Sequence, residues 1–234
     1  MKNPHISINQ VSLSVGGRSI LCDIDAQLSD RRIGIVGRNG SGKSTLARCL
    51  CGLIKPTSGK VILDDIDIYA DRKQAIRKIG ILFQNPDHQI IYPTVGEEID
   101  FGLRQIGHTA AQARDATRQI LTRFDTLNWL DRQTASLSQG QKQLLCLMSI
   151  LAMEPDVIVL DEPFSGLDIP TRRILGDVFQ SLPQTVIHIT HDPEAIETYD
   201  QVLWLDAGRI QQIGSPSQVL PKFMDAMMIA SGLT

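Results

Sequence analysis

Apolar and polar residues alternate along the first thirty residues, and short uniformly apolar runs replace this alternation further on. The alternation over Ile6–Val15 predicts a half-buried strand, the pair Gly16-Gly17 predicts a hairpin turn, and residues 20–28 predict the return strand. Uniform apolar runs bounded by turn residues are typical of strands buried on both faces of a parallel sheet. Mostly apolar runs of this kind predict further strands over residues 32–36, 61–63, 79–83, 157–160, 186–190 and 202–206.

Helical spacing of apolar residues dominates residues 86–154, where no strand pattern is present. It predicts helices over residues 96–105, 110–124 and 139–153. Other helices are predicted over residues 45–53, 170–180 and 193–199, and one or two short ones over the tail at 216–232. We therefore expect an α/β fold whose core, residues 1–85 and 155–215, combines an N-terminal antiparallel part with a mostly parallel sheet. A helical subdomain at 86–154 and a helical tail at 216–234 complete this expectation.

Composition narrows the class of protein. Of the 234 residues, 42% are hydrophobic and 21% are charged, which favours a packed core over disorder. The net charge of −3 and the absence of a lysine-arginine block argue against a nucleic-acid partner. Neither a membrane-spanning run nor a signal peptide is recognisable, so we expect a cytosolic protein that reaches a membrane only by docking onto another subunit. The four cysteines are interpreted as reduced, mostly buried thiols rather than a zinc site.

A glycine-rich loop follows the predicted strand at 32–36. It matches the phosphate-loop pattern G-x-x-x-x-G-K-[ST], between a strand and a helix. Glycines let consecutive backbone N–H groups converge on phosphate oxygens, and the helix beginning at the lysine adds the positive end of its dipole. Lys43 is expected to reach the β- and γ-phosphates of ATP and Ser44 to bind Mg²⁺. The predicted nucleotide-binding residues here are Gly37, Arg38, Asn39, Gly40, Ser41, Gly42, Lys43, Ser44 and Thr45.

Two acidic residues end the predicted strand at 157–160. Ligands of parallel sheets bind outside the carboxyl ends of the strands, which is where these acids fall. We expect Asp161 to hold Mg²⁺ and Glu162 to orient or polarise the attacking water.

The run Leu137-Ser138-Gln139-Gly140-Gln141 resembles the L-S-G-G-Q signature of ATP-binding cassette (ABC) ATPases, with Gln139 in place of the third-position glycine. The resemblance implies an ABC-type phosphate-loop fold over nearly the whole chain. It also implies that Ser138, Gln139, Gly140 and Gln141 contact the γ-phosphate of ATP bound by a second subunit. Their residue types suit this contact, because a hydroxyl, a glycine N–H and a helix N-terminus all favour an anion.

Three further landmarks of that family follow in order. Gln84 matches the Q-loop glutamine, which contacts Mg²⁺ and joins the two subdomains. Asp168 closes Ser165-Gly166-Leu167-Asp168, which matches the D-loop at the dimer interface. His191 matches the switch histidine at the γ-phosphate. The resemblance therefore implies Glu162, His191 and Gln84 as catalytic residues, and Ser44, Gln84 and Asp161 as the metal site.

One position departs from the family pattern. An aromatic residue normally stacks on adenine near the end of the first strand, and Val15 occupies the matching place. Valine offers contact without base stacking, an interaction worth about 1–3 kcal/mol. We expect adenine to contact Val15 and Arg18 and to be held loosely.

The segment after Gln84 specifies the branch of the family. Asn85-Pro86-Asp87-His88-Gln89 and the later Thr94-Val95-Gly96-Glu97-Glu98-Ile99 resemble the ATPases of energy-coupling-factor (ECF) uptake modules. This resemblance implies a homodimer or heterodimer of ATPases at the cytoplasmic face of the cell membrane. It also implies an integral membrane coupling subunit and a subunit that captures a vitamin or metal ion. Because the chain ends at Thr234 without a long C-terminal segment, its outline is similar to the short ATPases of biotin-type modules.

Three alternatives stay open on the sequence. The chain could serve an ordinary ABC importer or exporter, a soluble ABC ATPase of translation or DNA maintenance, or a scaffold that binds nucleotide without hydrolysing it. Neither a second cassette nor a long basic insertion is present, which disfavours the soluble ATPase. The presence of Glu162 and His191 disfavours the scaffold.

Overall fold

The computed structural model describes residues 3–230. One of its two sheets is antiparallel, with strand order β2-β1-β4-β5. The predicted hairpin is present between β1 (Ile6–Val15) and β2 (Arg18–Leu28), and both of its turn glycines have positive φ angles, 57° and 79°. This conformation is easy for glycine and matches the twist of the two strands. The other two strands are β4 (Ser58–Leu63) and the short β5 (Ile66–Asp67).

In the second sheet, the strand that precedes the phosphate loop lies near the middle. Its strand order is β10-β9-β3-β8-β7-β6, and all neighbouring pairs are parallel except β10 with β9. The strands span β3 (Arg32–Val36), β6 (Ile79–Leu82), β7 (Val157–Asp161), β8 (Thr185–Thr190), β9 (Gln201–Asp206) and β10 (Arg209–Gly214). Every residue of β7 and β8 is buried, as the apolar run of β7 predicts, and β8 also buries the polar residues Thr185, His188 and Thr190. The expected α/β fold with a mostly parallel sheet is therefore confirmed.

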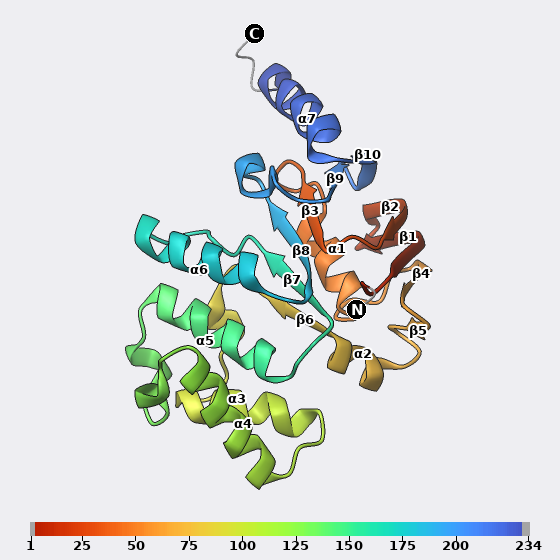
Figure 1. Cartoon of the computed structure of the whole chain (residues 1–234). Helices are drawn as coiled ribbons and strands as arrows, with labels where there is room; N and C mark the ends of the chain where they lie inside the picture. The colour runs from red at the N-terminus through yellow and green to blue at the C-terminus, as the bar shows by residue number, and fades with distance from the viewer. Residues whose placement is uncertain (1–2, 231–234) are drawn as a thin grey trace.

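Helices cover both faces of this sheet (Figure 1). On one face α1 (Lys43–Leu50) is packed between the sheet and the antiparallel strands, in a core that includes Ile33, Ile35 and Leu46. On the other face, Leu160 and Val186 of the sheet pack in one core with apolar residues of four further helices. These are α3 (Val95–Gln105), α4 (Ala110–Arg123), α5 (Gln139–Ala152) and α6 (Ile169–Ser181).

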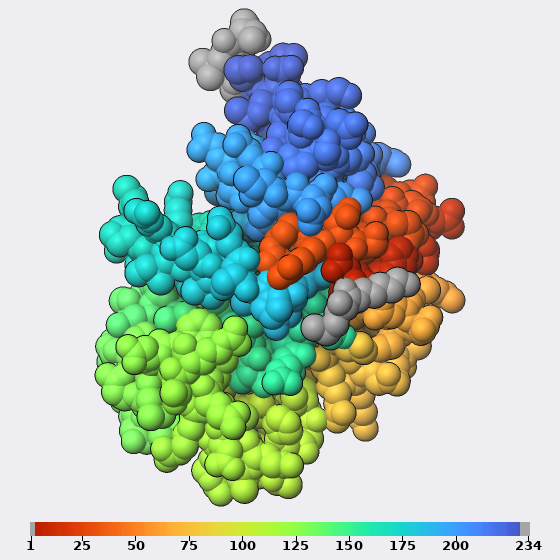
Figure 2. All heavy atoms as spheres, viewed as in Figure 1, coloured from red at the N-terminus to blue at the C-terminus, as the bar shows by residue number. Residues whose placement is uncertain are grey.

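The C-terminal helix α7 (Pro216–Ala230) forms a third, smaller core against β9. Phe223 lies edge-on to Trp204, with ring centroids 5.9 Å apart. Figure 2 shows α7 and the α3–α4 region at opposite ends of the molecule. The predicted tail helix is a single helix here, and residues 231–232 of that prediction lie outside the described residues. Between residues 3 and 230, no helix is both long and apolar enough to cross a membrane.

Several elements differ from the expectation. Helix α2 (Arg72–Lys78) was not predicted, because it buries only Ala75 and so has no apolar stripe. Strand β10 was also not predicted, since its sequence is mostly polar and its pairing with β9 is a tertiary contact. The helix predicted at 193–199 is instead one 3₁₀ turn, Pro193–Ile196, which Asp192 caps.

Candidate active site

The loop between β3 and α1 is built by close backbone approach and left-handed turns. A side chain at Gly37 would collide with the carbonyl of Leu205, so only glycine fits there. Gly40 and Gly42 have φ angles of 78° and 104°, which glycine adopts without strain. Gly42 is the N-cap of α1 and supplies no capping side chain, so the first N–H groups of the helix have no side-chain acceptor. These features form a cradle suited to an anion.

Lys43 is the cation of this cradle. Its side chain is buried, and its Nζ donates to the carbonyl oxygens of Gly37 and Arg38 at 2.7 and 3.0 Å. Burial lowers the pKa of Lys43, while the nearby carboxylates of Glu162 and Asp161 act in the opposite direction. Ser41 Oγ, also buried, has no hydrogen-bond partner among the described residues. The loop therefore holds an ammonium group on weak backbone acceptors and an unpaired hydroxyl, two groups that a phosphate would satisfy.

Ser44 and Asp161 meet where α1 begins and β7 ends. Ser44 Oγ donates to Asp161 Oδ1 at 2.9 Å. Burial raises the pKa of Asp161, and this hydrogen bond together with Arg48 and Lys43 opposes the rise. Between residues 3 and 230, no cluster of three or more His, Cys, Asp or Glu residues could hold a metal ion. One carboxylate and one hydroxyl still fit Mg²⁺, which commonly takes few protein oxygens and completes its shell with water and substrate phosphates.

Glu162 turns away from Asp161 although the two are adjacent in sequence. Its φ angle is 51°, in the left-handed region, and its backbone N–H donates to the carbonyl of Ile189 at 3.0 Å. This geometry brings Glu162 Oε2 to 2.7 Å from His191 Nδ1. The Glu162 side chain is 13% exposed and that of His191 is 64% exposed, so the histidine forms the open side of the pair. The pair combines a proton acceptor with a group that fixes its orientation.

A cavity of about 470 Å³ joins these groups. It brings residues 39–45 of the loop, apart from Ser41, together with Gln84, Glu162 and His191, whereas Gly37, Arg38 and Asp161 do not line it. Val15 does not line it and is 62% exposed at the tip of the hairpin. Arg18, for which a contact with adenine stays a prediction, lines it, and Ile20 lines it without having been predicted. The signal for Ile20 was available, because residues two apart on a strand share a face. The full lining is Arg18, Ile20, Asn39, Gly40, Gly42, Lys43, Ser44, Thr45, Gln84, Glu162 and His191.

Ser138, Gln139, Gly140, Gln141 and Asp168 do not line this cavity. Ser138 and Gln141 cap α5 reciprocally, because each side chain accepts a hydrogen bond from the other residue's backbone N–H, at 3.3 and 3.0 Å. Asp168 caps α6 by accepting from the Thr171 N–H, and its hydrogen bonds to Thr171 lower the pKa of its carboxyl. A side chain at Gly140 would collide with Thr171, so the first turns of α5 and α6 are in close contact. Within one subunit these residues form a surface separate from the cavity.

Gln84 connects the cavity with the predicted D-loop. Its Nε2 donates to Ser165 Oγ at 3.1 Å, which leaves the amide oxygen as the group that can turn towards the cavity. Ser165 belongs to the predicted D-loop, although its bond to Gln84 was not foreseen. No local pattern could have shown this bond, because the two residues are 81 positions apart.

Comparison with known proteins places this geometry in a family. The ABC transporter family model matches residues 23–165. The biotin transport ATP-binding protein BioM of Rhodobacter capsulatus is 48% identical over 95% of this chain and 95% of its own length. The energy-coupling factor transporter ATP-binding protein EcfA2 of Symbiobacterium thermophilum is 34% identical over 91% of this chain and 77% of its own.

A solved structure agrees with the sequence relatives. The structure of cbiO1 from Clostridium perfringens, described as part of the ABC transporter complex cbiONQ, superposes with a TM-score of 0.79. It is 30% identical and covers 92% of this chain and 90% of its own. Together with the phosphate loop, the Ser44–Asp161 contact and the Glu162–His191 pair, these matches identify the family. The chain belongs to the ABC transporter family and is one of its ATP-binding ATPase subunits.

Proposed function

We propose that this chain is the ATPase subunit of an ECF-type uptake transporter whose cargo is biotin. The observation that carries the proposal is the cleft in which the phosphate loop faces Glu162 and His191, in a chain 48% identical to a biotin transport ATPase over 95% of its length. The ECF-like run after Gln84 supports the same branch of the family. The biotin assignment rests on this relative, since the cargo contacts other subunits.

The chemical step follows from the residues of the cleft. Lys43 exchanges its backbone acceptors for β- and γ-phosphate oxygens, which are stronger acceptors for an ammonium group. Glu162 accepts a proton from the attacking water as the water oxygen bonds to the γ-phosphorus and the bond to the β-phosphate oxygen breaks. His191 holds Glu162 through the 2.7 Å contact and presents its other ring nitrogen to the γ-phosphate.

Ser44, Asp161 and Gln84 are proposed to hold Mg²⁺. When bound, this ion neutralises charge on the phosphate oxygens. The hydroxyl of Ser44, which lines the cleft, already contacts Asp161, so the two oxygens lie together before any ion binds. Arg18 and Ile20 form the base end of the cleft, and a role of Val15 in base binding stays a prediction.

The separate surface formed by Ser138–Gln141 and Asp168 supports a head-to-tail dimer. Each ATP would lie between the phosphate loop of one subunit and the α5 N-terminus of its partner, either a second copy or a related ATPase. The further partners are an integral membrane coupling subunit and a biotin-capturing membrane subunit. The complex would place this chain peripherally at the cytoplasmic face of the cell membrane, and no nucleic acid takes part.

Two measurements test the proposal. Glu162→Gln should keep ATP affinity within about two-fold, lower turnover by about 100-fold or more and trap the ATP-bound dimer. Unchanged turnover would refute the catalytic role. Expression of the chain with its membrane partners should support uptake of labelled biotin that the same variant abolishes. Copurification with membrane subunits that transport another compound would refute the cargo while leaving the ATPase assignment intact.

A further inference from the structure

The segment after Gln84 is fastened to the first turns of α5 by two contacts that the hydrolysis chemistry does not use. Lys142 Nζ lies 2.6 Å from Asp87 Oδ1. Gln143 Nε2 donates to the carbonyl oxygen of Phe83 at 3.1 Å, and Gln143 is 1% exposed. Phe83 is the residue before Gln84, and Lys142 is the residue after Gln141. The contacts therefore attach the segment on both sides of Gln84, which lines the cleft, to the helix that carries the signature surface, Ser138–Gln141.

The segment between the two contacts is itself held in a fixed turn. The backbone N–H of Phe83 donates to Gln89 Oε1 at 3.2 Å, and that of Asp87 donates to Asn85 Oδ1 at 3.0 Å. Pro86 and Asp87 belong to a single 3₁₀ turn, Pro86–His88, which packs against α5. A displacement of Gln84 is consequently transmitted to α5 rather than absorbed in a loose loop.

The charge at Lys142 makes this attachment depend on Asp87. A cation near the N-terminus of a helix is disfavoured by the helix dipole, and Lys142 lies in the opening turns of α5. The Lys142 side chain is only 19% exposed, so water solvates its positive charge only in part. Asp87 is the acidic partner that offsets both effects. The Asp87 side chain is 54% exposed, so the pair is partly open to water and its contribution to the free energy of unfolding is expected to be modest.

We propose that the Asp87–Lys142 ion pair and the buried Gln143 amide are positioning elements that make the two ATP sites of a dimer cooperate. This inference rests on the proposed head-to-tail dimer, in which α5 of one subunit completes the ATP site of the other. Gln84 responds to the nucleotide in its own cleft, and the two contacts carry its position to Ser138–Gln141 at the opposite site. Binding of the first ATP thereby places the signature surface for the second.

The test uses the full-length chain in complex with its membrane partners, and measures ATPase rate against ATP concentration. Wild type is expected to give a Hill coefficient above 1, because two coupled sites share each transition. Asp87→Asn and Lys142→Met should each bring the coefficient to about 1 and lower kcat about five-fold. Binding of a fluorescent ATP analogue to the isolated chain should stay within about two-fold, since neither residue lines the cleft.

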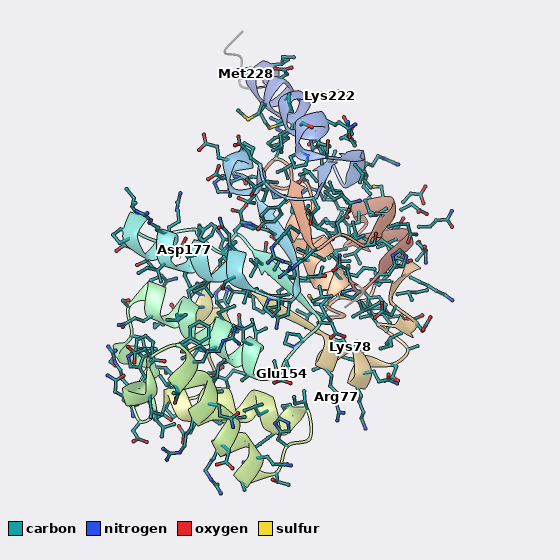
Figure 3. The ribbon with its side chains drawn as sticks, in the orientation of Figure 1. Arg77, Lys78, Glu154, Asp177, Lys222 and Met228 are labelled. Atoms are coloured by element: carbon teal, nitrogen blue, oxygen red, sulfur yellow. The ribbon has the colours of Figure 1, made fainter. Side chains whose placement is uncertain are left out.

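The exchange of the two charges separates positioning from simple loss of structure. Asp87→Lys combined with Lys142→Asp restores an ion pair and should recover at least half of the wild-type kcat together with the Hill coefficient. The matched control is Asp156→Asn, which breaks the Lys78–Asp156 pair of the same 2.6 Å length. Lys78 lies at the C-terminal end of α2 (Figure 3), where 37% of its side chain is exposed, and the control should leave both values unchanged.

Three results would overturn the inference. They are a wild-type Hill coefficient of 1, single variants that keep the wild-type coefficient, and an exchange variant no better than the singles. Each of these leaves biotin uptake and the effect of Glu162→Gln as they are. Failure of the inference is thus distinguishable from failure of the proposed function. A melting temperature measured for every variant identifies one that fails to fold, and in that event Gln143→Glu tests the second contact by the same readouts.

Discussion

His188 is a buried histidine that should make folding stability fall in mild acid. It is 1% exposed on β8, and its Nδ1 lies 3.0 Å from the hydroxyl of Tyr199. The ring of Phe164 meets the imidazole edge-on, with centroids 5.6 Å apart. Nε2 has no partner among the described residues. Burial without a carboxylate lowers the pKa of His188 from 6.5 to about 4.

The sign and size of the pH effect on stability follow from the difference between the pKa values of His188 in the unfolded and the folded chain. In the unfolded chain His188 titrates near pH 6.5, so between pH 6.5 and about 4 the unfolded state binds the proton and the folded state does not. The contribution of His188 to the free energy of unfolding is therefore fully present above pH 6.5 and is lost as the pH falls towards 4. One pH unit in this window is worth about 1.4 kcal/mol, so the loss between pH 7 and pH 5 is about 2 kcal/mol.

Urea denaturation at several pH values measures this loss. The free energy of unfolding of wild type should drop more between pH 7 and pH 5 than that of His188→Asn, and the difference should be about 2 kcal/mol. Asn is uncharged over this range and retains a polar atom for Tyr199. His88→Asn, at an exposed histidine, is the control and should preserve the wild-type pH dependence. Identical pH dependence of wild type and His188→Asn would refute the reasoning.

Three further predictions concern the cleft and the surface beside it. Ser44→Ala removes both the hydroxyl ligand and the 2.9 Å contact with Asp161, so Mg²⁺-dependent ATPase activity should fall by about 100-fold or more, while ATP retention without Mg²⁺ should change little. Gly140→Ala places a methyl group against Thr171 and should lower turnover in the dimer without changing nucleotide binding to the isolated chain; full activity would contradict the close packing. Arg18→Ala should raise the KM for ATP about five-fold, the equivalent of about 1 kcal/mol of base contact, and an unchanged KM would contradict that contact.

The sequence predicted the phosphate loop and the acidic end of β7 because their chemistry and their backbone geometry are local. The resemblance to ABC ATPases implied in addition that Gln84, Glu162 and His191 serve one site, and the cavity brings them together. Each of them follows a strand of one parallel sheet, and the carboxyl ends of such strands lie at a common edge. The contacts of Ser165 and Lys142 were not predictable in this way. Each depends on where a loop from one part of the chain comes to rest on a helix from another, and no periodicity encodes such a meeting. Helix α2 and strand β10 were not predicted for a related reason. Each buries little apolar surface, so its sequence has no apolar periodicity.

The left-handed backbone at Glu162 has a consequence for how this type of enzyme can change. Because the chain turns at that residue, two neighbouring acids serve different contacts: Asp161 remains with Ser44, and Glu162 is directed to His191. Substitution of the second acid therefore leaves the first contact in place. Nucleotide binding and nucleotide hydrolysis are thus separable by a single codon, and a duplicated copy of this gene could lose the reaction while keeping the ligand. A pair of unequal subunits, one hydrolysing and one only binding, is one substitution away from a pair of equal ones.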